Sequence, residues 1–437
     1  MKTNFLKLIV LLFSTAIYSQ AGHIMQGVGS VNMSMGGAST AQPLDISGAL
    51  QWNPAAISVF NDKILKVDIG LFFSSPELNS TVPEFNAQGQ PTGNFFNGRT
   101  EDDRGVSPMP AIAFVFGKED SKHTFGVSAF GISGFGVTFP ESTTNPINMP
   151  QQFGGFGRIE SDYMLLQVGL TYAYEISDKF SIGVEPTFNY SALELMPNPT
   201  ANPSLAGYPS TTNKATATGF GAQFGLFFDS GSGFKAGVAY KTTQAMGDFE
   251  FENTYLDNTT GTNNFNMDYP AILSLGLGYS KGDIDLALDY RMVDYENTDG
   301  FSKTGWTQTA SVAGFGWENI SILSAGIQYK GIDKLPLRLG YTYSSNPINE
   351  EVTFFNIPAP AIIKNAFQLG FSYEASDSFS IDAVYHYGTS GGETKGQLLN
   401  PQFIQNFPPY GAIPGSEVSY EMTTSMIMFG LSYTFSK

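Results

Sequence analysis

The sequence predicts an all-β protein, a 14-stranded antiparallel transmembrane β-barrel with a small, partly helical N-terminal plug. Three observations predict this fold. Segments in which apolar and polar residues alternate occur 14 times after residue 62, and the connections between them are short and long in turn. The third observation is the composition, because the 437 residues include 48 glycines and 14% aromatic residues but only 14% charged residues. An even number of amphipathic strands with alternating loop lengths is typical of bacterial outer-membrane barrels.

The first 20 residues have the features of a secretory signal peptide. Lys2 and Lys7 precede the apolar run 8–13, and small residues follow it up to Ser19. The run is too short to cross a bilayer as a helix, and no later segment offers about 20 consecutive apolar residues. We therefore expect a signal peptide over residues 1–20 and a mature protein without membrane-spanning helices.

Residues 21–62 are expected to form the plug. The stretch 21–60 is rich in Gly, Ala and Ser, and Asp45 is its one acidic residue. Such a segment can pack inside a barrel wall without leaving charges unpaired. Asn53 followed by Pro54 predicts a helix N-cap with proline at the first helical position.

The barrel is expected over residues 63–437. In its first segment, Val67, Ile69 and Leu71 share one face and polar residues occupy the other. About 14 strands enclose a lumen too wide for side chains to fill, so the apolar faces should point outward to lipid. The segments with this alternation lie near 63–73, 108–117, 122–131, 160–175, 179–195, 214–229, 233–251, 267–280, 283–294, 319–330, 335–345, 361–374, 379–388 and 417–435.

The connections between these segments fall into two classes. Short ones alternate with longer ones that are rich in Pro, Asn, Gly and Thr, and in outer-membrane barrels the long loops are extracellular. The short connections are 117–122, 177–179, 229–233, 280–283, 330–334 and 375–378. The long loops, expected outside, are centred near residues 90, 148, 204, 258, 306, 353 and 402.

The plug block resembles the N-terminal plug of the FadL/TodX family of outer-membrane transporters for hydrophobic compounds. The matching elements are Gly27-x-Gly29, the Met-Gly-Gly-Ala run 35–38, Asp45, and Asn53-Pro54-Ala55. The resemblance implies a monomer in the outer membrane of a Gram-negative bacterium, in contact with outer-membrane lipids, that passively transports long-chain fatty acids or similar hydrophobic molecules. Two alternatives are an aromatic-hydrocarbon or general channel, and a structural or adhesive barrel without transport.

In that family a kink in the third strand lets the substrate leave sideways into the membrane. Here the third segment continues into a glycine-rich stretch with Gly131, Gly134 and Gly136. Glycine inside a strand often marks a bulge or a close approach. We expect this stretch to kink inward and open the wall, with the helix at Asn53-Pro54-Ala55 sheltering the freed backbone groups. The alternative is an ordinary strand end softened by glycine.

A fatty-acid carboxylate would need a cation in a dry pocket, preferably Arg because its guanidinium binds carboxylates in a bidentate manner. By alternation, Arg338 and Lys364 face inward and are the candidates, whereas Asp289 and Arg291 share one face and are expected to form a structural ion pair. The resemblance also implies an apolar groove of extracellular loops that captures the substrate. Its candidate residues are Phe95, Phe96, Met149, Phe153, Leu205 and Tyr208.

Other classes of function find little support. The chain has no cysteine, which excludes a disulfide scaffold and a cysteine zinc site. The net charge of −17 argues against nucleic acid as a partner. His23, His123 and His386 have no Ser/Asp arrangement nearby, and no glycine-rich phosphate-binding motif occurs. We therefore expect no enzyme activity, no catalytic residues, no metal and no other cofactor.

Overall fold

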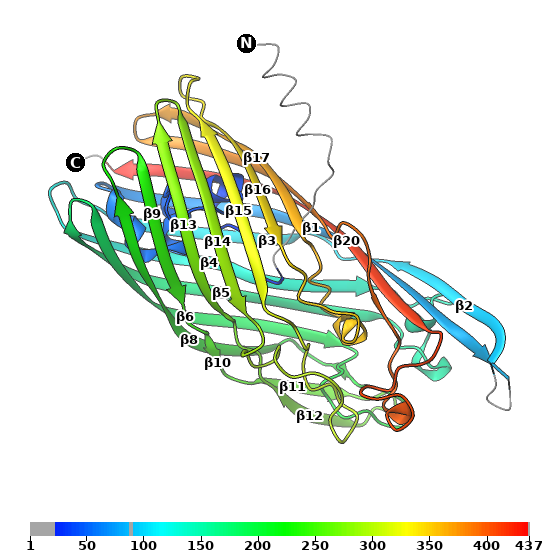
Figure 1. Ribbon diagram of the computed structural model, residues 1–437. Coiled ribbons are helices and arrows are strands. Elements are labelled where there is room, and N and C mark those ends of the chain that lie inside the picture. The colour runs from blue at the N-terminus through cyan, green and yellow to red at the C-terminus, as the bar shows by residue number, and fades with distance from the viewer. Residues whose placement is uncertain (1–21, 87–90, 436–437) are drawn as a thin grey trace, which may run out of the picture.

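The computed structural model describes residues 22–86 and 91–435 (Figure 1). The predicted signal peptide over residues 1–20 lies outside this range. In the described ranges no helix has both the length and the apolar character needed to span a bilayer. The architecture is one closed sheet of 14 long antiparallel strands around a small helical segment, as the alternation predicted.

The closed sheet follows chain order, and its ends join where β1 pairs with β20 from Lys63↔Phe435 to Thr81↔Glu417. The number and order of strands confirm the sequence prediction. The barrel strands are β1 (Lys63–Phe85), β3 (Ser107–Phe116), β4 (His123–Phe139), β5 (Ile159–Ser177), β6 (Phe180–Met196), β8 (Ala215–Asp229), β9 (Phe234–Lys241), β13 (Ala271–Lys281), β14 (Ile284–Asp294), β15 (Ile320–Tyr329), β16 (Leu337–Ser344), β17 (Asn365–Ser376), β18 (Phe379–Thr389) and β20 (Glu417–Phe435).

The long connections carry structure of their own at one end of the barrel (Figure 1). The predicted segment 233–251 is divided between β9 and two loop strands, and β1 runs further than predicted to pair with β2. The loop strands are β2 (Pro91–Glu101), β7 (Ser210–Thr211), β10 (Ala245–Met246), β11 (Phe249–Thr254), β12 (Thr260–Phe265) and β19 (Thr394–Gly396). The short loop helices are η2 (Pro146–Asn148), η3 (Gln151–Phe153), η4 (Thr353–Asn356) and η5 (Pro401–Phe403).

The wall is apolar outside and polar inside. On β14, Leu286, Leu288 and Tyr290 are exposed on the outer face, whereas Asp285 and Asp289 are buried toward the lumen. The other strands show the same period of two, which matches the outward apolar band of a membrane barrel. The predicted orientation of the faces is therefore confirmed.

Three short helices lie inside the barrel, near the end that carries the short turns (Figure 1). They are α2 (Ser30–Ser34), α3 (Ile46–Trp52) and η1 (Pro54–Val59). The Asp45 side chain caps α3 by accepting from the Gly48 N–H at 3.0 Å, and Asn53 caps η1 by accepting from the Ala55 N–H at 3.0 Å. The predicted Asn-Pro cap is confirmed, although the helix that follows is a 3₁₀ helix.

The plug fits closely because several wall residues that face it are glycines. A Cβ added at Gly183 would lie 2.3 Å from the Ala55 nitrogen, and one at Gly237 would lie 2.1 Å from the Thr40 oxygen. Glycine is thus required where two backbones touch. Gly225, Gly276, Gly278, Gly326 and Gly340 also face plug backbone in this way, whereas Gly370 and Gly430 face the side chains of Ser34 and Ser30.

Candidate functional site

Buried charges of the wall hold the plug. The Lys66 ammonium lies 2.6 Å from Asp382 on β18 and 3.3 Å from Asp45 of the plug. All three side chains are almost fully buried. A buried charge is tolerated only when it is paired, so this triad fixes the plug at a defined position.

A second ion pair holds the plug on the other side of the lumen. Asp289 and Arg291 are 2.6 Å apart and both are 1% exposed, which confirms the predicted pair. The Arg291 guanidinium also donates to the Gly37 oxygen at 2.8 Å and lies 3.7 Å from the centre of the Trp52 ring. Since Gly37 and Trp52 belong to the plug, the pair contributes to plug seating as well as to the wall.

The wall is interrupted between β3 and β4. These strands pair only where residues 111–116 face residues 125–130, although β3 pairs with β1 from residue 107 onward. Pro108 and Pro110 lie in the unpaired part of β3. Proline has no backbone N–H, and within sheets it is therefore found mainly on edges that lack a partner. The two prolines thus suit an edge that has lost its pairing with β4, and this signal in the sequence was overlooked.

On the other side of the gap, β4 changes its register. A bulge lies between Gly131 and Ser133, after which β4 follows only β5 up to Phe139. Gly131, Gly134 and Gly136 line the gap. Gly134 and Gly136 align with Met164 and Asp162, whose side chains belong to the outer face of β5. The glycines therefore remove side chains from the outer surface beside the gap.

Residues 22–25, here called the N-terminal segment, satisfy the backbone groups that the kink in β4 leaves without a strand partner. Met25 N–H donates to the Ile132 oxygen at 3.0 Å, and the His23 oxygen accepts from Gly134 N–H at 3.2 Å. The Ser133 hydroxyl donates to the same His23 oxygen at 2.9 Å. This corrects the expectation that the Asn53 helix shelters the kink.

The Asn53 side chain is bound at another part of the lumen. Its amide donates to the oxygens of Thr40 and Leu226 at 2.8 and 3.0 Å, and η1 packs against β5, β6 and β8. The shelter was misassigned because the sequence does not reveal which plug residues reach which strand.

Residues 102–104 close the outer end of the gap. Asp103 N–H donates to the Thr138 oxygen at 2.8 Å, and Asp102 accepts from the Thr138 N–H. The Arg104 guanidinium pairs with Asp162 at 2.5 Å, and its Nη1 lies where a Cβ on Gly136 would be. The gap is thus a window that is bounded at one end by residues 102–104 and at the other by the last β3–β4 pair, Ala111↔Phe130.

A cavity of about 390 Å³ occupies this window. Its lining is mainly apolar, and Arg104 and Asp162 are the charged residues among the described residues that line it. The barrel wall, the N-terminal segment and the loop residues Pro360 and Ala361 all contribute to this lining. Representative lining residues are Met25, Phe72, Met109, Phe135, Tyr163, Leu165 and Ala361.

The long loops form a second apolar cavity, of about 530 Å³. Of the residues predicted for a loop groove, Phe96, Met149, Phe153 and Tyr208 line it. Phe95 does not, and Leu205 is fully exposed to solvent. Trp306 and Phe354 line the same cavity, and Trp306 had not been singled out from the sequence.

A narrow cavity of about 50 Å³ lies next to the loop cavity. The two share Phe156, Tyr208, Trp306 and Phe354. The chain from residue 354 then leads onward, because Phe355, Ile357 and Pro358 line the narrow cavity and Pro360 and Ala361 line the window. The three cavities therefore follow one buried segment from the loops to the wall.

The two candidate cations lie away from the window. Arg338 is buried near the short-turn end, where it donates to Gln328 and Ser372 at 2.6 and 2.7 Å. Lys364 is half-buried at the start of β17. Neither residue lines the window cavity.

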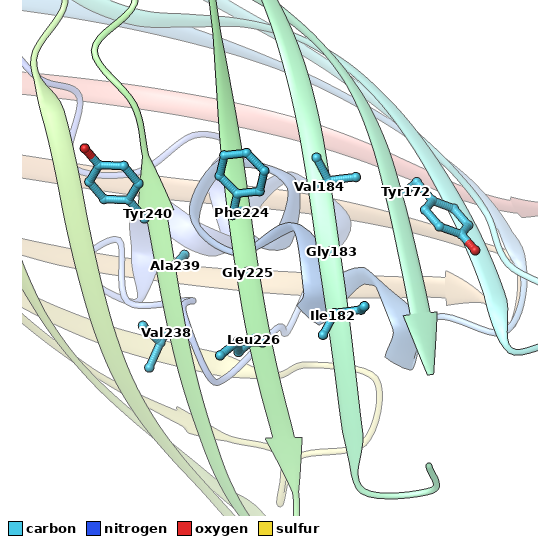
Figure 2. A pocket seen from close by; sticks show the side chains of 10 residues that line it. All are labelled: Tyr172, Ile182, Gly183, Val184, Phe224, Gly225, Leu226, Val238, Ala239 and Tyr240. Carbon is cyan, nitrogen blue, oxygen red and sulfur yellow. The ribbon is translucent and has the colours of Figure 1, made fainter. Parts of the chain in front are cut away.

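A separate hollow of about 460 Å³ lies on the outer face of the wall. Figure 2 shows two rows of apolar side chains, one through Phe224 and one through Leu226, with the plug behind the strands at Gly183 and Gly225. These side chains face lipid, so this hollow belongs to the membrane-facing surface and does not connect with the route inside the barrel.

Comparison with known proteins identifies the family. A family model described as Outer membrane protein transport protein (OMPP1/FadL/TodX) matches residues 12–436. A search of curated protein sequences found no match.

Solved structures share the fold. The toluene transporter TodX of P. putida is similar with a TM-score of 0.68 and 16% identity, covering 94% of this chain and 99% of that one. A Pseudomonas aeruginosa FadL homologue gives 0.69 and 16%, with 95% and 99% covered. The CymD monoaromatic hydrocarbon channel gives 0.61 and 17%, with 94% and 98% covered. The chain belongs to the OMPP1/FadL/TodX family and is an outer-membrane β-barrel transport protein, not an enzyme.

Proposed function

We propose that this protein passes uncharged hydrophobic molecules inward from the cell surface and releases them sideways into the outer membrane through the window between β3 and β4. The observation that carries the proposal is the apolar cavity in that window, at a point where the wall has lost its strand pairing. Unpaired backbone facing lipid costs several kcal/mol per group, so a wall opening is retained only where something shelters it. Here the N-terminal segment does so.

The plug argues against a straight path through the lumen. It is seated on wall glycines and tied by the buried groups around Lys66 and Asp289. A molecule that moved straight through would have to displace these contacts. A sideways route requires only apolar contacts, and burial of apolar groups stabilises the bound molecule by about 0.8 kcal/mol per CH₂.

The route proposed has three stages. The molecule is captured in the loop cavity, passes the narrow cavity at Trp306 and reaches the window. Outside the cell, the polar surface of the membrane obstructs such molecules, and release into the membrane avoids carrying them through water. We place the protein in this role as a monomer surrounded by outer-membrane lipids.

The charges support an uncharged substrate. In the described part of the chain, the most deeply buried lumen cations each have a hydrogen-bond or ion-pair partner on the wall or plug. The pairs are Lys66 with Asp382, Lys241 with Gln167, Arg291 with Asp289 and Arg338 with Gln328. The relatives described as a toluene transporter and a monoaromatic hydrocarbon channel suggest aromatic hydrocarbons as the first compounds to test.

A long-chain fatty acid is the second candidate because of Lys364. This half-buried lysine has no ion-pair partner among the described residues, so it is available for a carboxylate. Replacing Lys364 with Met should lower uptake of a labelled fatty acid while leaving toluene uptake unchanged. Arg338→Met serves as the comparison at the other candidate. Equal fatty-acid uptake by both variants and the unmodified protein would remove these two residues from the substrate site.

The window is tested by filling it. A Cβ on Gly131 would meet only Met109 Cε at 3.8 Å and Pro110 O at 3.9 Å, so Gly131→Leu can be accommodated without backbone strain and projects toward the gap. We expect uptake of labelled toluene to fall several-fold at unchanged surface expression. Ala129→Leu, on the same face of β4 below the window, is the matched control. Unchanged uptake in Gly131→Leu with the leucine confirmed in the gap would overturn lateral release.

A further inference from the structure

A box of aromatic rings surrounds His23. The ring centre of His23 lies 4.8 Å from that of Phe301, 5.6 Å from Trp317 and 5.5 Å from Tyr295. Tyr269 and Tyr163 complete the box at 5.8 and 6.0 Å. All six side chains are buried. The box joins the N-terminal segment to Tyr163 on β5, to Tyr269 just before β13, and to three residues between β14 and β15. These three are Tyr295, Phe301 and Trp317.

Three polar atoms inside the box have no hydrogen-bond partner among the described residues. They are His23 Nε2, Tyr163 Oη and Tyr269 Oη. By contrast, His23 Nδ1 lies 2.7 Å from the Tyr295 hydroxyl, and Trp317 Nε1 donates to Asn356 at 2.6 Å. Leaving a polar group buried and unpaired is costly, so native proteins rarely do so without a bound water or ligand.

The box contains only neutral groups. Burial lowers the pKa of His23 to about 3, so its ring is uncharged at physiological pH. The nearby Arg291 guanidinium is bound to Asp289. The carboxylate of Asp268, adjacent to Tyr269 in sequence, would repel an anionic ligand. The three unpaired atoms can therefore donate to or accept from an uncharged group, but they cannot neutralise a carboxylate.

The box adjoins the window. Tyr163 lines the window cavity, and the Tyr163 ring stacks on Phe135 of the same cavity with centres 4.9 Å apart. Gly22, immediately before His23, also lines the cavity. A molecule in the window thus has its apolar part against the wall and the box at its inner side.

We propose that this box binds the uncharged oxygen of a hydrophobic molecule, a hydroxyl or carbonyl, while the rest of the molecule lies in the window. The inference rests on the proposed function and narrows its substrate class from hydrocarbons in general to oxygenated hydrocarbons such as phenols, alcohols and ketones. A hydroxyl suits the box because it can both donate and accept, as the two tyrosines and the imidazole require. The apolar part of the molecule supplies most of the binding, and the oxygen supplies selectivity.

The test uses two ligands of nearly equal shape, p-cresol and p-xylene, which differ by a hydroxyl in place of a methyl group. Dissociation constants are measured by calorimetry with the purified full-length protein. The unmodified protein should bind p-cresol about tenfold more tightly, the size of effect expected for one or two net hydrogen bonds. Tyr269→Phe and Tyr163→Phe should each remove most of this preference and leave the p-xylene affinity unchanged.

A control variant and a stability measurement distinguish loss of the oxygen site from general damage to the protein. Tyr279→Phe, on the lipid-facing surface, is the matched control and should change neither affinity. Thermal unfolding reports folding, and the two box variants should be no less stable because each loses an unpaired buried hydroxyl. Equal affinity for the two ligands in the unmodified protein, or an unchanged preference in both variants, would mean that water alone fills the box. If neither ligand binds the unmodified protein, the proposed function fails together with this inference.

Discussion

Asp289 on the barrel wall accepts both the backbone N–H and the hydroxyl of Thr40 in the plug, at 2.9 and 2.7 Å. The same carboxylate oxygen accepts from the Ser39 N–H and pairs with Arg291. One buried wall residue therefore satisfies two consecutive plug amides and one buried cation. This concentration of contacts makes the plug part of the folded barrel.

The first prediction concerns this residue. Asp289→Ala should destabilise the protein by about 3–5 kcal/mol, because it leaves the Arg291 guanidinium buried without its partner. We also expect the plug to loosen and single-channel conductance to rise. Asp283→Ala, in the exposed turn before the same strand, should change neither quantity. A fully stable Asp289→Ala protein with unchanged conductance would contradict the anchoring role of Asp289.

The second prediction concerns the plug as a whole, which we assign to residues 21–62. Deleting this segment while keeping the signal peptide should leave a 14-stranded barrel with an open lumen. Conductance in planar bilayers should rise well above that of the intact protein, since the segment occupies the lumen near the short turns. A deletion variant that folds but conducts no better would show that the lumen is blocked by another element.

The third prediction is the orientation of the barrel. The tip of the β11–β12 hairpin at Asn258 should be extracellular and the β8–β9 turn at Gly231 periplasmic, because short turns of outer-membrane barrels face the periplasm. An epitope tag inserted at Asn258 should be labelled on intact cells, whereas one at Gly231 should be labelled only after permeabilisation. The reverse pattern would invert the proposed direction of transport.

The fourth prediction concerns Trp306, which lines both the loop cavity and the narrow cavity. Its ring lies 5.0 Å from Phe355 in an edge-to-face contact, so Trp306→Ala should widen the narrow cavity. Uptake of a bulky two-ring hydrocarbon should rise relative to toluene. Phe153→Ala, in the loop cavity alone, is the control and should not change this ratio. An unchanged ratio in Trp306→Ala would place the size limit elsewhere.

The sequence by itself determined the barrel. Period-two alternation, an even strand number and the separation of short from long connections are local properties of the chain, and closure of the sheet follows from them. The cap at Asn53 and the pairing of Asp289 with Arg291 were also predictable, because both depend on residues close in sequence. The glycines at the kink could be singled out for the same reason.

The tertiary structure alone decided which distant parts meet. His23 reaches Gly134 and Tyr295, and Pro360 reaches the window, across separations that no local pattern encodes. The Asn53 helix was expected at the kink but packs on β5, β6 and β8, because plug placement depends on complementary glycines and charges spread over many strands. Local periodicity fixes how each strand faces, whereas the site depends on side chains that converge only after the barrel has closed around the plug.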